Sequence, residues 1–239
     1  MKLKIGLIGF GKTGKAVASV ILHNQDFSLE WVYRQSSQLD KRSVPEFLGV
    51  TSDELGIIYS AASTSIEEVL KQQPVDFIID FSSNDGIYSY GQIAANQKIK
   101  IISAISHYSD KEIEYLKELS KSTTVFWSPN ITLGVNFLLF ASRFLKNIAP
   151  WVDIEIIEEH FKGKVGLSGT AIKIANALDI NKDVINSIRA GGIVGKHEVV
   201  FGFPYQTIRL IHESISREAF GNGAMFAAQN LVNKKEGLY

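Results

Sequence analysis

Residue types suited to acid–base and anion chemistry gather between Glu155 and Thr170, in the run EIIEEHFKGKVGLSGT. His160 and Lys164 stand four residues apart, and Ser168-Gly169-Thr170 closes the run just before a helical pattern. A histidine exchanges protons near neutral pH, and a nearby lysine can hold an anion or donate a second proton. A Ser-Gly-Thr turn that feeds a helix offers backbone N–H groups and hydroxyls to a carboxylate or phosphate. The run indicates a site for a small anionic substrate that needs a proton; in the alternative interpretation it is a solvated loop with an ordinary helix cap.

A second candidate site lies near the start of the chain, where a glycine-rich turn joins an apolar run to a helical pattern. Residues 3–8 (LKIGLI) are expected to form a buried strand, and KAVASVILHN follows the turn with helical periodicity. This order is typical of dinucleotide-binding sites, whose glycines permit a tight turn, approach of a pyrophosphate and close helix packing. The alternative is a turn that needs glycine for packing alone. The predicted cofactor-binding residues of this motif are Gly9, Phe10, Gly11, Lys12, Thr13 and Gly14.

The second predicted strand, Leu29–Tyr33, is followed by Arg34 and not by an acidic residue. Sites that prefer NAD usually place an acid there to bind the ribose 2′-hydroxyl. Arg34 instead offers a planar cation to a 2′-phosphate, and Ser36 and Ser37 add hydroxyls. The sequence therefore favours NADPH, with NADH possible, unless Arg34 is only a surface residue beside a turn.

Strand and helix patterns alternate through residue 128, as expected for an α/β protein with a doubly wound parallel sheet. Helices are predicted over 65–73, 87–96 and 109–122, and strands over 77–82, 99–103 and 124–128, whereas 38–63 carries no clear pattern. Sheets of this kind bind ligands beyond the carboxyl ends of their strands. We therefore expect the residues that follow the strand at 99–103 to face the cofactor.

Residues 128–136 break this rhythm with a proline and a glycine, which marks a crossing between domains. A helix is predicted over 136–148, a strand over 153–160 and a helix over 170–178, followed by glycine-punctuated strands of antiparallel type. The tail forms one amphipathic helix pattern, for which the first domain is the natural host. The predicted domains are 1–129 with 214–239, and 130–213; a sheet with one free face in the latter would support oligomers.

Composition limits the remaining classes of function. The chain has 239 residues, 45% of them apolar, enough for a real core, and its 25 basic and 25 acidic residues leave no net charge to favour nucleic acid or membrane. It has no cysteine, which excludes disulfides, thiolate catalysis and cysteine metal sites, and we expect no bound metal. No apolar run reaches the ~18 residues of a membrane span, and the first residues are expected to form a strand and not a signal peptide. We expect a cytoplasmic protein that acts on a small molecule.

Five runs of the chain resemble the dihydrodipicolinate reductase (4-hydroxy-tetrahydrodipicolinate reductase) family over nearly the full length. These runs are IGFGKTG (8–14), IIDFSS (78–83), PNITLGVN (129–136), DIEIIEEHFKGKVGLSGT (153–170), and RAGGIVGKHEVVF with SREAFGNGA (189–201, 216–224). The resemblance implies an N-terminal Rossmann domain and a smaller α+β substrate and oligomerisation domain with a mixed or antiparallel sheet, assembled as a homotetramer. It also implies hydride transfer from NADPH to a cyclic imine-type dicarboxylate in lysine and diaminopimelate biosynthesis.

The resemblance also implies roles for single residues. His160 falls on the catalytic proton donor or acceptor, and Lys164 falls on the second proton donor. The expected substrate-binding residues are Phe161, Ser168, Gly169 and Thr170. Besides the glycine turn and Arg34, the expected cofactor-binding residues are Ser103, Ala104, Ile105, Ser128, Pro129, Asn130 and Ile131.

Three departures from the family pattern fall in the substrate or nicotinamide pocket. Phe161 stands where a second histidine is usual, Val165-Gly166-Leu167 is one residue shorter than the usual loop, and Ser103-Ala104-Ile105-Ser106 replaces a Gly-Thr-Thr-Gly run. Two alternatives stay open: a related reductase of a different cyclic imine acid, and a non-catalytic NADPH-binding regulator. Retention of both His160 and Lys164 argues against the regulator.

Overall fold

The computed structural model describes residues 2–239, which form two compact units. One unit contains the chain up to Pro129 together with Phe220–Tyr239, and Asn130–Ala219 form the other. The sequence placed the return to the first unit at residue 214, six residues before the observed position. Ser214, at the predicted boundary, is the last residue of β10 and is paired in register with Gly195, so it belongs to the second unit.

The first unit is built on a seven-stranded sheet in the order β11-β6-β5-β4-β1-β2-β3, in which all named strands pair in parallel. Its strands are β1 (Leu3–Ile8), β2 (Phe27–Arg34), β3 (Ile57–Ser60), β4 (Phe77–Asp80), β5 (Lys100–Ser103), β6 (Thr124–Trp127) and β11 (Gly237–Leu238). The chain order reverses between β1 and β4. In doubly wound sheets this reversal marks the ligand-binding edge, and the glycine turn follows β1 directly.

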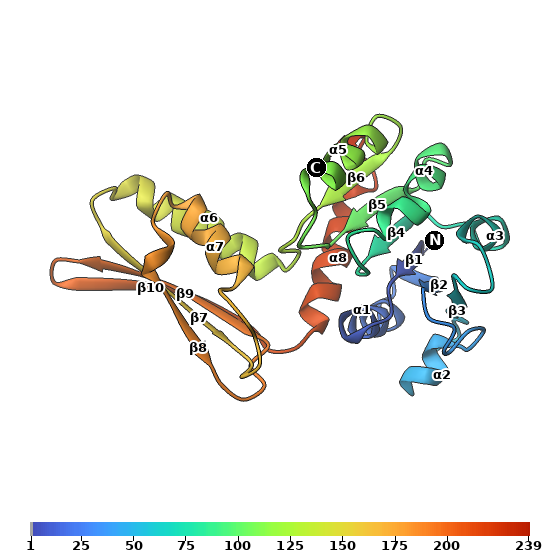
Figure 1. The fold of residues 1–239 in the computed structure, drawn as a ribbon, viewed down its shortest axis with the longest axis horizontal. Helices are drawn as coiled ribbons and strands as arrows, with labels where there is room; N and C mark the ends of the chain where they lie inside the picture. Colours follow the sequence, from blue (N-terminus) through green and yellow to red (C-terminus); the bar gives the residue numbers. More distant parts are fainter. Residues whose placement is uncertain (1) are drawn as a thin grey trace. The chain divides into compact units, whose positions relative to one another are not determined.

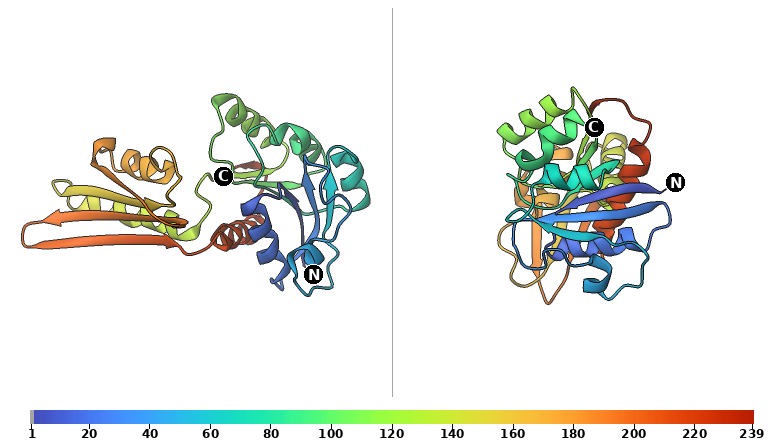
Figure 2. Two further views of the ribbon diagram at one scale, coloured as in Figure 1. Left: turned by 60° about the horizontal axis from the view of Figure 1, so that its bottom comes forward. Right: turned by 90° about the vertical axis from the view of Figure 1, so that its right-hand side faces the viewer.

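Helices cover both faces of this sheet: α3, α4 and α5 lie over one face and α1 and α8 over the other (Figures 1 and 2). Their bounds, with that of the short α2, are α1 (Lys12–Leu22), α2 (Val44–Leu48), α3 (Ile66–Gln72), α4 (Ile87–Asn96), α5 (Asp110–Leu119) and α8 (Glu218–Leu231). A capping box begins α3, because Ser65 Oγ accepts from the backbone N–H of Glu68, whose carboxylate accepts from the N–H of Ser65. The predicted start of this helix is therefore confirmed.

Trp31 on β2 is the largest fully buried side chain of the first unit. Its indole N–H donates to the carbonyl of Gln73 at 3.0 Å. The ring lies directly over Gly6 of β1, where a Cβ would stand 2.2 Å from a ring carbon, so only glycine fits there. This contact holds β1 and β2 in the arrangement that delivers the glycine turn and Arg34 to the same edge of the sheet.

The second unit is a four-stranded mixed sheet in the order β10-β9-β7-β8. Its elements are α6 (Leu133–Ile148), β7 (Asp153–His160), α7 (Gly169–Ala177), a 3-10 turn (Lys182–Val184), β8 (Ile185–Arg189), β9 (Gly195–Phe203) and β10 (Gln206–Ser214). The β7–β8 pair is parallel and the other pairs are antiparallel. The sheet is thus of the mixed kind, and the expectation that all strands after α7 pair in antiparallel fashion is wrong for β8.

Helices α6 and α7 lie on one face of the mixed sheet (Figure 1). The apolar side chains Ile154 and Ile156 of β7 point to this face and pack in one core cluster with Leu138 of α6 and Ile174 of α7. Because side chains alternate along a strand, Glu158 and His160 continue the same row. The fold therefore directs two ionisable side chains under the helices at the end of β7. None of the helices within residues 2–239 has the length and apolar character needed to cross a bilayer.

Candidate active site

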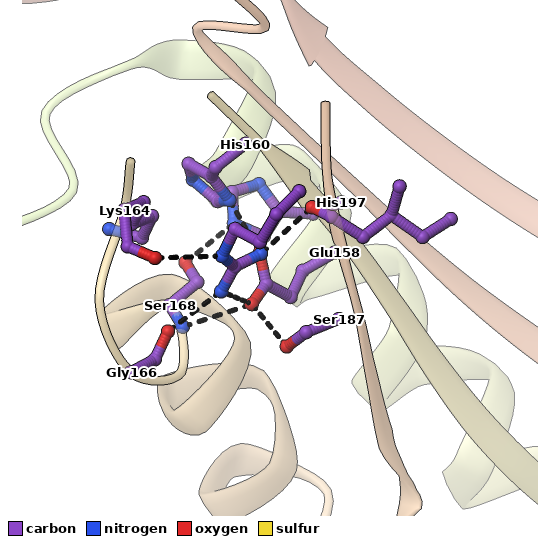
Figure 3. Close-up of polar contacts among 9 residues, drawn as sticks. Glu158, His160, Lys164, Gly166, Ser168, Ser187 and His197 are labelled. Atoms are coloured by element: carbon purple, nitrogen blue, oxygen red, sulfur yellow. Dashed lines mark hydrogen bonds and ion pairs between the residues drawn. The ribbon is translucent and has the colours of Figure 1, made fainter. Parts of the chain in front are cut away.

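Glu158 is the centre of a buried polar cluster at the carboxyl end of β7 (Figure 3). Its carboxylate accepts hydrogen bonds from Arg189 Nη1 at 2.9 Å and Nη2 at 2.5 Å, from Ser187 Oγ at 2.6 Å and from the backbone N–H of Ser168 at 3.3 Å. The parallel register of β7 and β8 explains this arrangement, since Glu158 is aligned with Ser187, and His160 with Arg189. Burial alone would raise the pKa of Glu158, but the hydrogen bonds from Arg189, Ser187 and His160 outweigh it and lower the pKa to about 2. Glu158 is therefore a fixed negative charge.

His160, the last residue of β7, shares this carboxylate. Its Nδ1 lies 2.5 Å from Glu158 Oε2, which leaves Nε2 as the ring nitrogen free for other chemistry. Burial lowers the pKa of His160 below its usual 6.5; the Glu158 carboxylate raises it, while the Lys164 and Arg189 cations lower it further. The imidazole is therefore mainly neutral at pH 7, and a negatively charged ligand nearby would favour its protonation.

The loop after β7 carries Lys164 and is attached to the same cluster through its backbone. The N–H of Lys164 donates to the carbonyl of Phe161 at 3.0 Å, which closes a tight turn. Arg189 donates to the carbonyls of Lys164 at 3.2 Å and Gly166 at 2.7 Å. One guanidinium thus positions both the carboxylate behind His160 and the loop that presents Lys164, while Phe161 is exposed on that loop.

Ser168 and His197 form a second buried contact beside His160. The hydroxyl of Ser168 lies 2.9 Å from His197 Nε2, and the rings of His160 and His197 meet edge to face with centroids 5.3 Å apart. Burial, reinforced by His160 and His212, lowers the pKa of His197 to about 3. His197 is consequently neutral at physiological pH and serves as a hydrogen-bonding partner of Ser168, not as a second cation.

The hydroxyls of Ser168 and Thr170 at the start of α7 do not have the roles predicted from the sequence, which were to bind an anion or to cap the helix. The Ser168 side chain does not cap the helix, since its hydroxyl meets His197, and Thr170 Oγ1 donates to Asn130 Oδ1 at 2.7 Å. The N–H of Ser168 is also used, by Glu158. The groups of α7 that remain available to an anion are the backbone N–H groups of its first turn. This turn begins at Gly169, which is exposed and has no atom within 4 Å of a Cβ position.

A pocket of about 320 Å³ lies at the glycine turn of the first unit. It is lined by Ile8, Gly9, Phe10, Gly11, Tyr33, Arg34, Gln35, Ser36, Ser82, Ser83, Gly86 and Ser89. Gly9 has φ +93°, and a Cβ on Gly14 would lie 2.2 Å from the Gly9 carbonyl oxygen, so the turn and the close helix contact both require glycine. Gly11 instead faces open space, with no atom within 4 Å of a Cβ position. These residues fit a dinucleotide, whose pyrophosphate needs an uncovered backbone at the second glycine.

The other predicted cofactor residues are distributed over several positions. Lys12 and Thr13 are in the first turn of α1 and, with Gly14, do not line this pocket. At the ends of β5 and β6, the N–H of Ser128 donates to the carbonyl of Ser103 at 3.0 Å, which brings Ser103–Ile105 and Ser128–Pro129 together at one edge of the first unit. Asn130 and Ile131 belong to the second unit.

Four residues of the Glu158 cluster were not among the candidates from the sequence: Glu158 itself, Ser187, Arg189 and His197. A signal for Glu158 was present, since residues two apart on a strand share a face and Glu158 precedes His160 by two. Ser187 and Arg189 could not be recognised in this way, because their role depends on the β7–β8 register.

A doubly wound parallel sheet with a dinucleotide turn, joined to a smaller unit with a mixed sheet, is an architecture of the class of NAD(P)H-dependent oxidoreductases. Comparison with known proteins supports this class and narrows it. The model of the dihydrodipicolinate reductase N-terminus matches residues 3–131, and the model of its C-terminus matches residues 131–239. The chain therefore belongs to the dihydrodipicolinate reductase family.

Individual relatives agree. The chain is 32% identical to 4-hydroxy-tetrahydrodipicolinate reductase of Caldanaerobacter subterraneus, covering 96% of this chain and 92% of the relative, and 26% identical to that of Methanocaldococcus jannaschii, covering 99% and 95%. Among solved structures, a dipicolinate-bound dihydrodipicolinate reductase from Paenisporosarcina has a TM-score of 0.79 at 18% identity, covering 100% of this chain and 97% of that one. An amine dehydrogenase from Mycobacterium smegmatis has a TM-score of 0.68 at 11% identity, covering 100% and 95%, and shares the fold.

Proposed function

We propose that the protein reduces 4-hydroxy-tetrahydrodipicolinate, a cyclic imine-type dicarboxylate, with NADPH, as a step of lysine and diaminopimelate biosynthesis. The observation that carries this proposal is the Glu158–His160 pair beside the Lys164 loop and the start of α7, in a chain of this family. The bound cofactor supplies the hydride. The substrate must also lose its 4-hydroxyl group as water and gain a proton, and this chain's own residues must provide that proton.

His160 is the proposed proton donor. Glu158 holds Nδ1, so Nε2 is the atom that can carry a proton to the ring of the substrate. The two substrate carboxylates would raise the lowered pKa of His160 when they bind, so that the imidazolium forms where it is needed. Glu158, with its pKa of about 2, stays ionised and stabilises that imidazolium.

Substrate binding is assigned to the start of α7 and to the loop before it. The backbone N–H groups of Gly169 and Thr170 lie at the positive end of the α7 dipole, where they would bind a carboxylate of the substrate. Lys164 adds a full positive charge as the second proton donor or anion partner. Ser168 and Phe161 complete the proposed pocket, in which Ser168 is held by His197.

NADPH is assigned to the pocket of the first unit because of Arg34. Arg34 lines that pocket beside Ser36, and its Nη1 donates to the carbonyl of Gln38 at 3.2 Å, which restrains the side chain. Since β2 ends without an acidic residue, the site lacks the usual partner of an NAD ribose and presents a cation suited to a 2′-phosphate.

We further propose that the first unit is the dinucleotide-binding domain and the second the substrate domain of a cytoplasmic homotetramer. The proposed tetramer contact is the face of the mixed sheet opposite α6 and α7. It exposes Ile188 of β8 and Ile211 of β10 among polar side chains, which is suited to association between copies.

The decisive experiment is NADPH oxidation with the product generated by dihydrodipicolinate synthase. Turnover supports the proposal. A reductase of a different cyclic imine acid remains the second candidate, because the exposed Phe161 gives the substrate loop an apolar surface where the family usually has a histidine. A panel of cyclic imines tests that candidate, and NADPH binding without turnover of any of them would identify a regulator.

A further inference from the structure

Helix α6 has an outer face that the fold of the second unit leaves uncovered. Its inner face packs on the mixed sheet through Val135 and Leu138, which are buried. The outer face carries six large apolar side chains at helical spacing, each between 56 and 73% exposed. These residues, called the α6 stripe below, are Leu133, Phe137, Phe140, Phe144, Ile148 and, just beyond the helix, Trp151.

The α6 stripe is uncharged along its whole length. The two cations of the helix, Arg143 and Lys146, donate to backbone carbonyls of the α7 terminus: Arg143 Nε to Ala177 at 3.2 Å, and Lys146 Nζ to Leu178. A helix that lies on a membrane surface typically flanks its apolar face with lysine and arginine that reach lipid headgroups. Because both cations of α6 are engaged within the unit, the face is better suited to another protein surface than to a bilayer.

The size of the α6 stripe matches a stable protein contact. Aromatic side chains have about 150–250 Å² of surface each, so six large side chains exposed to this degree present on the order of 700 Å². A standard interface buries about 800 Å² per partner, whereas the largest apolar patch on a monomer is usually about 300–600 Å². The face is therefore large enough to form most of one side of a specific interface.

The order of side chains along the α6 stripe is self-complementary. Relative to the level of Ser142, Leu133 and Trp151 lie nine residues away on either side, Phe137 and Ile148 five and six residues away, and Phe140 and Phe144 two residues away. If two such helices pair antiparallel about a two-fold axis near Ser142, the smallest end residue meets the largest, and Phe137 meets Ile148. Interfaces between identical copies require this kind of symmetry.

We infer that the α6 stripe binds the α6 stripe of a second copy of this chain, in an antiparallel, two-fold symmetric contact. Leu133 of one copy then opposes Trp151 of the other, and Phe140 opposes Phe144. This contact uses the helix-covered side of the second unit, so it is separate from the open sheet face proposed above for the tetramer. It depends on neither the substrate nor the cofactor assignment.

The first test compares the double variant Phe140→Lys/Phe144→Lys with wild type and with Leu55→Lys by sedimentation equilibrium. Leu55 is a matched control, since it is 69% exposed in a loop of the first unit. The double variant should have half the wild-type mass, with unchanged circular dichroism, because four buried lysines cannot be accommodated in the contact. The Leu55 variant should keep the wild-type mass. A double variant of wild-type mass, or a monomeric wild type, would overturn the inference.

The second test uses the absence of cysteine from the natural chain. Leu133→Cys and Trp151→Cys are prepared as single variants. Each variant is treated alone with a short bis-maleimide, and a mixture of the two is treated in the same way after subunit exchange. Cross-linked dimers should form in the mixture and not in either variant alone, because only the antiparallel pairing brings the two positions together. Dimers that form equally well in each variant alone would exclude this pairing. Wild-type binding to zwitterionic phospholipid vesicles that is lost in the double lysine variant would assign the face to membranes instead.

Discussion

The Nδ1 atom of His160 and the Oε2 atom of Glu158 lie 2.5 Å apart at the end of β7, two positions from each other on the same face of the strand. This contact sets which nitrogen of the imidazole is available, because the other ring nitrogen is occupied. The carboxylate is in turn held by Arg189 and Ser187 from the parallel strand β8. The imidazole of His160 is therefore oriented by strand register, not by loop conformation.

Replacing His160 with alanine should lower turnover by the roughly 10²–10⁴-fold expected for the loss of a general acid, with NADPH affinity unchanged. Steady-state kinetics and fluorescence titration of NADPH measure the two quantities. His23→Ala is the matched control, since His23 is exposed at the end of α1. Full activity in the His160 variant would remove its assigned role.

Glu158→Gln should lower turnover by about 10–100-fold and reduce the fraction of His160 that is protonated in the complex, because the fixed negative charge is lost. Glu159→Gln is the neighbouring control, whose carboxylate pairs with Lys196 instead.

Wild-type stability should also depend on Glu158 in acid. Its pKa is lowered from 4.5 to about 2 on folding, so its contribution is present above about pH 4.5 and is lost as the pH falls toward 2. Urea unfolding at pH 2–5 checks this, and equal pH dependence in both variants would contradict it.

Arg34→Ala should weaken NADPH binding by about 10–100-fold, the loss expected for hydrogen bonds to a charged group, and should spare NADH. Isothermal titration with both cofactors measures the difference. Arg42→Ala, at an exposed arginine of the following loop, should leave both affinities unchanged. An equal loss for both cofactors in the Arg34 variant would show that Arg34 does not bind the 2′-phosphate.

Gly11→Ala should fold normally but lose at least about tenfold in NADPH affinity. Gly11 has φ −77° and open space at its Cβ position, so alanine is compatible with the fold but occupies the surface that a pyrophosphate would approach. Gly9→Ala should instead destabilise the protein by about 1–3 kcal/mol or more, because φ is +93° and the Cβ would lie 2.7 Å from the Phe81 carbonyl oxygen. Thermal unfolding and cofactor titration of both variants separate the two effects; unchanged NADPH binding in Gly11→Ala would contradict the assignment.

Asp80, buried at the end of β4, should make stability fall as pH rises from about 4 to 6. Burial raises its pKa from 3.8 to about 6, although Ser82 and Tyr90 donate hydrogen bonds to it. The folded state therefore binds more protons than the unfolded state in this window, and ionisation costs up to about 3 kcal/mol. Denaturation curves of Asp80→Asn should lack this component, while the exposed control Asp53→Asn should retain it. Parallel curves for wild type and Asp80→Asn would refute the prediction.

The sequence predicted best what depends on local pattern. The glycine turn, the helix at 87–96 and the strand at 153–160 were placed correctly, because glycine spacing and hydrophobic periodicity act over a few residues. Residues 38–63 were left without elements, yet they contain α2 and β3. Strand β11 was read as the end of a helix, since Gly237–Leu238 is too short to show alternation and forms only by pairing with β6.

The candidate site was also predictable only in part, because only some of its residues are specified by a local pattern. His160 and Ser168 were recognised by residue type and spacing along the chain. The partners of these two residues, Arg189 and His197, come from β8 and β9, and their approach depends on the register of the mixed sheet. The Ser168 hydroxyl was expected to be available to a ligand, but His197 already occupies it.

The order of synthesis follows from the way the first unit closes. Its sheet gains β11 beside β6 only from residues 237–238, and α8 packs on α1 where Gly221 approaches Val20. A ribosome must therefore translate all of residues 130–219 before the amino-terminal half can complete its sheet, so the inserted unit is free to fold first. During that delay β6 is an uncovered sheet edge, at which strands of other chains can pair wrongly.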